Sequence, residues 1–273
     1  MSRWYEIGGL RLRVDGEVFE RDLLAERYHP FEATEGPADL RVEIHPVPGF
    51  QNRAVAEGRA GDDPYVLRDG VWTIHRLDYE ATLVGPGHLR ARTDGTLGAL
   101  NGLLRHLLVW ALHERKGLLL HAAGIRVGAG IRALAGPSGA GKTTACRHAP
   151  SWAMVLGDEH LVVLPRDDGL WAWGTPIVGE LARPGNPAGG PLQSIDFIEH
   201  AHDNVRTALD IRETARRLIG CTVFYPFGRD RNALALEACA STAARVAAYR
   251  LRARGDGSFW ELFAPPDHAG VPG

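Results

Sequence analysis

The segment from Gly136 to Thr143 reads GPSGAGKT, and it constrains the fold of this chain more than any other segment. It fits the pattern G-x-x-x-x-G-K-[ST] without a mismatch, and a mostly apolar run, Ile131 to Ala135, precedes it. In this pattern the glycines let backbone N–H groups surround a phosphate, the lysine reaches the terminal phosphates and the hydroxyl can bind Mg²⁺. The residues expected to bind a nucleotide are Gly136, Pro137, Ser138, Gly139, Ala140, Gly141, Lys142, Thr143 and Thr144.

The choice of lysine at position 142 supports this prediction. The chain has 31 basic residues, of which only Lys116 and Lys142 are lysines and the others are arginines. A compact ammonium on a flexible stem fits inside a phosphate-binding loop, where a planar guanidinium would not. We therefore expect Lys142 to contact the transferring phosphate and to count among the catalytic residues.

The composition is that of an ordinary globular protein. Hydrophobic residues make up 45% of the chain and charged residues 23%, with a formal net charge of −2. This balance gives no reason to expect a nucleic-acid or membrane partner. Cys146, Cys221 and Cys239 are too few and too scattered for a disulfide framework or a zinc site. Without a recognisable signal peptide or membrane span, the chain is expected to be cytoplasmic.

Residues 1–97 are predicted to form a β-rich N-terminal region. The alternation from Leu40 to Ile44 is typical of a half-buried strand, and two apolar runs within Tyr65 to Ile74 predict a hairpin. Leucines at helical spacing from Leu100 onward then predict a helix. This helix leads into a nucleotide-binding domain, residues 98–273.

The segment before the phosphate-binding loop predicts a hairpin. Leu118 to Arg126 reads as one strand, residues 127–130 as a tight turn and Ile131 to Ala135 as a second strand. The strand that leads into the loop is therefore expected to be antiparallel to its neighbour, whereas most proteins with this loop use parallel strands. We expect an α/β (α+β) protein whose core is a hairpin-paired mixed sheet.

An acidic pair, Asp158 and Glu159, follows the next predicted strand, Trp152 to Leu156. Such a pair can divide two tasks, because one carboxylate takes Mg²⁺ while the other accepts the proton of a hydroxyl acceptor. Asp158 is the first choice of base. Glu159 is the alternative base, and it is also a candidate metal ligand together with Thr143.

Other side chains are candidates for the same site. His121 precedes the loop by one hairpin and could lie near the phosphates. Glu180 could complete a metal shell, and Arg183 could meet a phosphate or an acidic substrate. Both belong to residues 174–191, a loop that is rich in glycine and proline. Few residues of this loop can anchor it in a core. We therefore expect the loop to be mobile and to close over bound ligands. Residues 46–64 have a similar composition and are expected to form a surface loop.

Four further residues are expected to lie outside the site. Arg126 and Arg132 read as solvated strand residues beside the predicted turn. His200 and His202 have metal-like spacing, but no cluster of other ligands accompanies them, and an exposed turn is the simpler interpretation.

His121, the segment GPSGAGKTT and the sequence Gly157-Asp158-Glu159 together resemble the nucleotide core of HPr kinase/phosphorylase. That fold is shared with ATP-dependent phosphoenolpyruvate carboxykinase, and the resemblance covers roughly residues 115–265. It implies that one acid of the pair acts as base toward a substrate serine and the other helps to hold Mg²⁺. It also implies a downstream metal-binding glutamate, for which Glu180 is the nearest match. The family has two aspartates where this chain has Asp158 and Glu159.

The segments GTPIVGE, PLQSIDFIEH and DGSFWEL resemble smaller HPr-kinase-like proteins found beside peptide-modification genes, including lasso-peptide precursor kinases. The signature that accompanies phosphorylase activity is not recognisable. The resemblance implies an ATP- and Mg²⁺-dependent kinase acting on a serine or threonine of a peptide or small protein, with a homo-oligomer as one option. A kinase of small alcohols or amino acids, and a nucleotide-binding regulator or scaffold with little transfer activity, are the alternatives.

Overall fold

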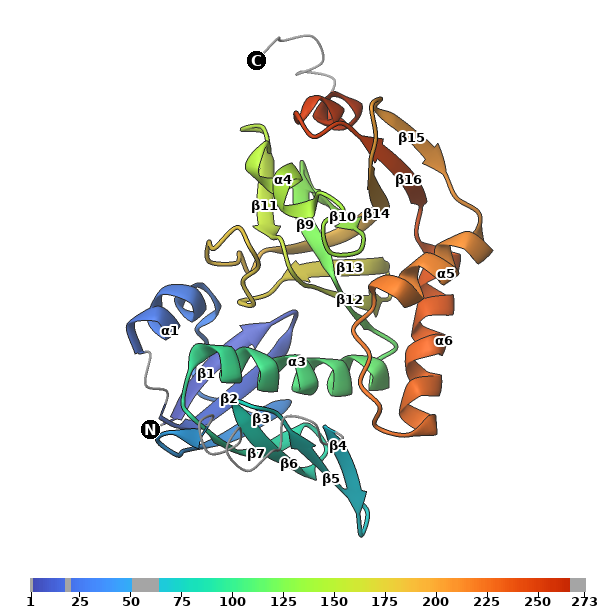
Figure 1. The fold of residues 1–273 in the computed structure, drawn as a ribbon. Helices are drawn as coiled ribbons and strands as arrows, with labels where there is room; N and C mark the ends of the chain where they lie inside the picture. The colour runs from blue at the N-terminus through green and yellow to red at the C-terminus, as the bar shows by residue number, and fades with distance from the viewer. Residues whose placement is uncertain (1, 18–20, 51–63, 266–273) are drawn as a thin grey trace.

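The computed structural model describes residues 2–17, 21–50 and 64–265. Across these ranges the chain forms a mixed α+β fold with two mixed sheets, and helix α3 (Leu97–Glu114) runs between them (Figure 1). The predicted β-rich N-terminal region is confirmed. Most of the surface loop predicted for residues 46–64 lies outside the described residues.

The N-terminal sheet has the strand order β1-β2-β3-β7-β6-β5-β4 in the described part of the chain. Its strands are β1 (Ser2–Ile7), β2 (Leu10–Gly16), β3 (Leu40–Pro46), β4 (Tyr65–Arg68), β5 (Val71–His75), β6 (Tyr79–Gly85) and β7 (His88–Thr93). The predicted hairpin is β4–β5, and the predicted alternation of β3 buries Leu40, Val42 and Ile44. Helix α1 (Arg21–Tyr28) and the 3-10 turn η1 (His29–Phe31) connect β2 to β3.

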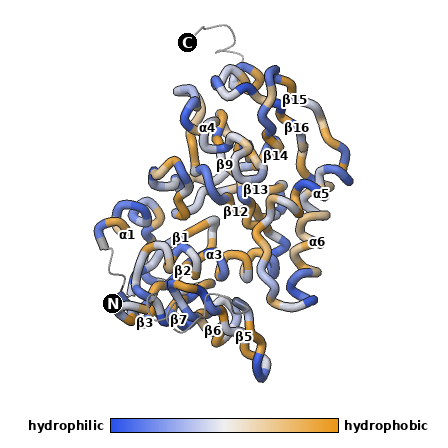
Figure 2. The backbone as a smooth tube through the Cα atoms, in the orientation of Figure 1, coloured by the Kyte–Doolittle hydropathy of each residue, from blue (hydrophilic) through white to orange (hydrophobic). Residues whose placement is uncertain are grey.

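Helix α3 joins the two sheets through its apolar residues. The Thr96 hydroxyl caps its first turn by accepting a hydrogen bond from the Ala99 N–H at 3.3 Å. Its buried leucines, among them Leu100, Leu104 and Leu108, belong to the core that covers the N-terminal sheet. Figure 2 shows the apolar character of this helix where it passes between the sheets. The N-terminal region therefore shares a core with the helix that leads into the second sheet.

The second sheet carries the segments that the sequence linked to a nucleotide. Its strands are β8 (Leu118–Leu120), β9 (Ala122–Val127), β10 (Gly130–Ala135), β11 (Ala153–Gly157), β12 (Leu161–Arg166), β13 (Gly169–Gly174), β14 (Gly189–His200), β15 (Val205–Ala208) and β16 (Ala248–Ala253). Strand β10 pairs antiparallel with β9, as predicted, and parallel with β14. The long β14 also pairs with β13 through its first residues and with β16 through its last.

One sequence prediction about this sheet is wrong. Leu118 to Arg126 is not a single strand, because the chain leaves the sheet at His121. The residues before His121 form β8 and pair with β12, whereas those after it form β9 and pair with β10 and β11. The His121 N–H instead donates a hydrogen bond to the Cys221 carbonyl at 2.7 Å.

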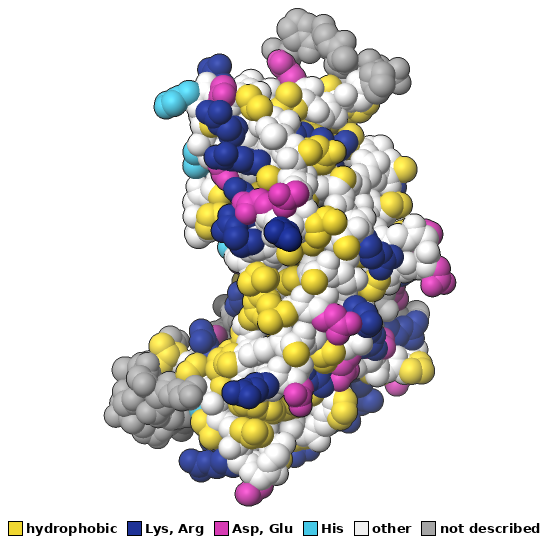
Figure 3. All heavy atoms as spheres, turned by 90° about the vertical axis from the view of Figure 1, so that its right-hand side faces the viewer, with side chains coloured by type: hydrophobic (Ala, Val, Ile, Leu, Met, Phe, Trp, Pro, Cys, Tyr) yellow, Lys and Arg dark blue, Asp and Glu magenta, His cyan; other side chains and the backbone are white. Residues whose placement is uncertain are grey.

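Helices cover both faces of the second sheet. Along β10, Ile131 and Ala133 face a core that includes α5 (Ile211–Cys221) and α6 (Arg229–Arg245). Leu134 faces the opposite core, which includes α4 (Lys142–Arg147) and the 3-10 turn η3 (Ser258–Phe263). This alternation follows from the two-residue period of a strand. Figure 3 looks onto the α5 and α6 side, where Lys and Arg side chains lie next to Asp and Glu side chains.

None of the described helices is both long enough and apolar enough to cross a membrane.

A buried histidine lies where α3 meets the segment between α5 and α6. The His106 ring stacks on Tyr225 with 3.9 Å between ring centroids, and its Nε2 lies 3.0 Å from the Tyr65 hydroxyl. Its Nδ1 lies 2.8 Å from the Gly102 carbonyl. Burial lowers the pKa of His106 from 6.5 to about 4, so the ring is neutral in the folded protein near neutral pH.

This histidine makes the stability of the fold depend on pH. Below pH 6.5 the unfolded chain takes up a proton at His106, whereas the folded chain does so only near pH 4. The contribution of His106 to the free energy of unfolding should therefore be at its maximum above pH 6.5. Between pH 6.5 and pH 4 it should decrease by about 1.4 kcal/mol per pH unit. Urea denaturation at several pH values should show a shallower acid slope for His106→Gln than for the wild type. Equal slopes for the two proteins would contradict this expectation.

Candidate functional site

The glycine-rich loop, residues 136–143, connects β10 to the start of α4. Gly139 and Gly141 have φ values of +78° and +105°, in the left-handed region that side chains disfavour. Gly141 is also the N-cap residue of α4, and its carbonyl accepts the Ala145 N–H of that helix at 2.8 Å. The backbone therefore favours glycine at Gly141 of the sequence pattern and at Gly139 within it, whereas at Gly136 a Cβ would lie only 2.8 Å from the Ala140 Cβ.

Lys142 points back into this loop. Its ammonium donates hydrogen bonds to the carbonyls of Gly136 at 2.9 Å and Pro137 at 3.0 Å, and only 6% of the residue is exposed. Burial lowers its pKa from the usual value. Among the ion pairs of residues 2–17, 21–50 and 64–265, none includes Lys142. A buried cation held by carbonyls alone is suited to exchange them for an anion.

Asp158 is fixed beside the first turn of α4. The Thr143 hydroxyl donates a hydrogen bond to its Oδ2 at 3.0 Å, and the Leu181 N–H donates to the same oxygen at 2.8 Å. Asp158 is 4% exposed, and Gly179 packs directly against its carboxylate. The Asp158 carboxylate and the Thr143 hydroxyl therefore form a pair of oxygen atoms next to Lys142.

Glu159 lies beside two imidazole rings. Its carboxylate is 3.6 Å from His121 Nε2 and 3.9 Å from His160 Nδ1, and the two rings stack with centroids 5.7 Å apart. The His121 imidazole holds the pKa of Glu159 below its usual range. Burial lowers the pKa of His160 to about 3, so this ring is neutral at neutral pH. Glu159 is therefore an ionised carboxylate with one partly exposed histidine at its side.

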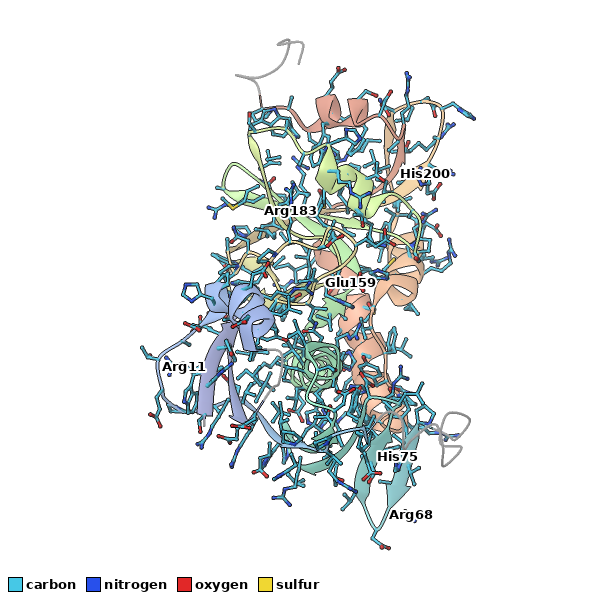
Figure 4. All side chains as sticks on the ribbon, turned by 60° about the vertical axis from the view of Figure 1, so that its left-hand side comes forward. Arg11, Arg68, His75, Glu159, Arg183 and His200 are labelled. Atoms are coloured by element: carbon cyan, nitrogen blue, oxygen red, sulfur yellow. The ribbon has the colours of Figure 1, made fainter. Side chains whose placement is uncertain are left out.

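One cavity of about 110 Å³ brings most of the predicted site residues together. It is lined by His121, Lys142, Thr143, Asp158, Glu159 and Glu180. Ser138, Gly139, Gly141 and Thr144 also line it, whereas Gly136, Pro137 and Ala140 line a neighbouring cavity. Arg183 lines a third cavity, on the other side of Asp158. In Figure 4, Arg183 and His200 lie above Glu159 and to either side of it.

Two residues that were expected to lie outside the site contact other groups than predicted, although His200 is exposed as expected. His200 ends β14, and its Nε2 lies 2.8 Å from the Gly139 carbonyl of the glycine-rich loop. His200 lies close to the glycine-rich loop because β14 pairs parallel with β10, and local sequence signals do not reveal this pairing. Arg132 is half-buried rather than solvated, and its Nη1 donates to the Ser194 hydroxyl at 3.2 Å. Burial lowers the pKa of Arg132.

The loop between β13 and β14 is anchored more firmly than its composition indicates. Thr175 and Ile177 are buried, and the Thr175 hydroxyl donates to the His160 carbonyl at 3.1 Å. Arg147 donates to the carbonyl of Glu180 at 3.4 Å. The prediction that few residues of this loop are anchored in the core was wrong, whereas its closure over a ligand stays a prediction.

The oxygen atoms of the cavity fit Mg²⁺ bound together with phosphates. Within the described residues, no group of three His, Cys, Asp or Glu side chains is placed to hold a metal ion by itself. Mg²⁺ in nucleotide sites commonly takes one or two carboxylates, and substrate phosphates and water complete its shell. The pair of Asp158 and Thr143 matches that requirement.

A family model described as SynChlorMet cassette protein ScmC matches residues 99–264. The chain belongs to the ScmC family. The ScmC match begins within α3 and ends just after η3, so it contains the glycine-rich loop and every residue that lines the 110 Å³ cavity. The N-terminal sheet precedes the ScmC match. No curated protein matches the chain.

Proposed function

We propose that this protein is an ATP- and Mg²⁺-dependent kinase with the nucleotide core of HPr kinase, and that it phosphorylates a serine or threonine hydroxyl of a peptide or small protein. The observation that carries this proposal is the 110 Å³ cavity, where Lys142, the Thr143–Asp158 pair and the Glu159–His121 pair meet. Phosphoryl transfer needs these parts: a positive charge on the phosphate, ligands for a metal ion and an acceptor for the hydroxyl proton.

The glycine-rich loop and Lys142 would hold the phosphates. The ammonium of Lys142 has carbonyl partners and no carboxylate partner among the described residues, so it can turn to a phosphate without breaking an ion pair. A charge fixed in this partly closed cavity stabilises the transferring phosphoryl group more than the same charge would in water.

Asp158 and Thr143 would hold Mg²⁺ against the phosphate oxygens. When bound, Mg²⁺ supplies positive charge that offsets the charge developing on the phosphate and leaving oxygens. The Thr143 hydroxyl donates a hydrogen bond to Asp158 Oδ2, so the two oxygen atoms already lie side by side. Leu181 keeps that carboxylate oriented through its backbone N–H.

Glu159 would then accept the proton of the acceptor hydroxyl. This assignment exchanges the roles first expected for the acidic pair, because Asp158 Oδ2 is already held by Thr143 and Leu181. Glu159 instead contacts the partly exposed His121, which orients the carboxylate and stabilises its charge. As the hydroxyl oxygen attacks the γ-phosphorus, the bond from that phosphorus to the bridging oxygen of ATP breaks and ADP leaves. The O–H bond of the acceptor also breaks, and its proton moves to a Glu159 oxygen.

The proposal is tested by a transfer assay with γ-labelled ATP and Mg²⁺. The acceptors are synthetic peptides from the other products of the cassette named in the family description, together with free serine and threonine. We expect label on a peptide hydroxyl and none when EDTA replaces Mg²⁺. Label on the free amino acids alone would replace the peptide with a small-molecule acceptor. ATP binding without any transfer would favour a regulator or scaffold and contradict the proposal.

Gly179 allows a separate test of the Asp158 site. A Cβ at this position would lie 2.8 Å from Asp158 Oδ1, so Gly179→Ala must displace the carboxylate. We expect Mg²⁺-dependent ATP binding to weaken about tenfold, which corresponds to about 1.4 kcal/mol. Isothermal titration with and without Mg²⁺ measures this change.

The matched control for Gly179→Ala is Gly157→Ala. A Cβ at Gly157 meets no atom within 4 Å, although this glycine directly precedes Asp158. The control should bind Mg²⁺ and ATP like the wild type. Normal binding by Gly179→Ala as well would count against Asp158 as a metal ligand.

A further inference from the structure

A second cavity, of about 630 Å³, meets the glycine-rich loop on the side away from the acidic pair. The strand order β11-β9-β10-β14 puts β10, and the loop that follows it, between Asp158 and the end of β14. The second cavity lies between the loop, the end of β14 and the last turn of α5. It shares Ser138, Gly139 and His200 with the 110 Å³ cavity, so the two spaces are continuous along the loop.

We propose that this second cavity holds the base and ribose of the nucleotide whose phosphates lie on the glycine-rich loop. The inference rests on the proposed function, because it takes the 110 Å³ cavity as the phosphate and metal site. That cavity lies below the range of roughly 300–1,000 Å³ in which protein sites hold molecules of nucleotide size. The second cavity lies within that range. A nucleotide whose terminal phosphates face Glu159 would extend along the loop, past His200, into it.

The lining of the second cavity suits a nucleoside. Phe197, Ile198 and Cys221 provide apolar surface, which matches the faces of an aromatic base. Arg216 and Arg217 stand on the α5 side, and guanidinium planes stack on flat rings. Glu199 offers carboxylate oxygens, which can accept hydrogen bonds from ribose hydroxyls.

The charged side chains around this cavity are held in place by one another. Arg217 lies 2.7 Å from Glu199 and 2.6 Å from Glu213, and Arg216 lies 2.7 Å from Glu213. Arg250 adds a second cation at 2.8 Å from Glu199. Glu213, Arg216 and Arg217 of this network belong to α5, and Figure 3 shows positive and negative side chains next to one another on the α5 side of the molecule. A network whose charges already pair suits a ligand part that is polar and uncharged, such as a ribose, better than it suits a phosphate.

Gly220 offers a way to fill the cavity without moving its walls. It lies in the last turn of α5 and lines the cavity, and a Cβ there would meet no atom within 4 Å. In Gly220→Trp the indole should therefore occupy the space proposed for the base. Gly220→Ala is the control, because it adds only the Cβ, and a helix tolerates alanine better than glycine.

The test compares binding of ATP with binding of tripolyphosphate, both with Mg²⁺. For Gly220→Trp we expect ATP affinity to fall at least tenfold and tripolyphosphate affinity to stay at the wild-type value. Gly220→Ala should bind both ligands like the wild type, with an equal or higher Tm. Unchanged ATP affinity in Gly220→Trp would overturn the inference, and so would an equal loss of both ligands.

Two further results separate this inference from the proposed function. If Gly220→Trp binds ATP normally but no longer phosphorylates the peptide, the cavity receives the acceptor and the inference fails while the kinase stands. If the wild-type protein binds neither ATP nor tripolyphosphate, the proposed function itself fails.

Discussion

Lys142→Ala is expected to fold like the wild type and to transfer phosphate roughly 10²–10³-fold more slowly. The ammonium of Lys142 is the cation of the glycine-rich loop, and its present partners are the carbonyls of Gly136 and Pro137. The substitution removes a charge from the cavity and leaves the backbone course of Gly139 and Gly141 unchanged. Single-turnover transfer at saturating ATP measures the loss.

The chain supplies its own control for this experiment. Lys116, the other lysine, is largely exposed and pairs with Glu237 at 3.1 Å, on α6. Lys116→Ala removes the same charge from the net balance and should leave transfer unchanged. Normal turnover of Lys142→Ala, or an equal loss in both variants, would contradict the proposed kinase.

Glu159→Gln and Asp158→Asn are expected to fail in different ways. Glu159→Gln removes the proton acceptor but keeps the shape of the side chain, so kcat should fall roughly 10²–10⁴-fold with little change in ATP affinity. Asp158→Asn removes the charge beside Thr143, so Mg²⁺-dependent ATP binding should weaken first. Titration of ATP with and without Mg²⁺, followed by single-turnover transfer, separates the two effects.

The reverse pattern would assign the role of proton acceptor to Asp158. In that case Asp158→Asn would bind Mg²⁺ and ATP normally and fail in transfer, whereas Glu159→Gln would lose binding. A third variant, His121→Gln, checks the partner of the base: because His121 lies 3.6 Å from Glu159, its loss should reduce kcat less than loss of Glu159 itself.

Local signals in the sequence predicted the parts of the fold that depend on neighbouring residues. The turn between Val127 and Gly130 predicted the β9–β10 hairpin, and the spacing of the leucines predicted α3. Strand β1 and helix α1 were not predicted, and in α1 the apolar residues are too few to give a clear helical period. The break at His121 was also missed, because apolar residues on both sides hide the change of partner strand.

For the candidate site, too, the sequence predicted only what depends on neighbouring residues. The glycine-rich loop, Asp158 and Glu159 were found from the sequence because each follows a strand that the sequence predicts. The distinct surroundings of the two acids depend on Leu181 and His121, whose contacts form across 23 and 38 residues of chain. The position of His200 depends on β14 lying parallel to β10, which is a long-range pairing. Patterns within a short window contain no information on such contacts.

The pairing of β14 also bears on the order in which the site can assemble during synthesis. Strand β14 supports the glycine-rich loop through His200, but its outer edge pairs with β16, Ala248–Ala253. The residues that line the 110 Å³ cavity have all been made by residue 200, yet β16, the strand that pairs with the end of β14, is completed only at residue 253. Until then β14 is an edge with unpaired backbone groups, the kind of surface that pairs readily with other chains. We therefore expect the site to be stably formed only after β16 has closed this edge of the sheet.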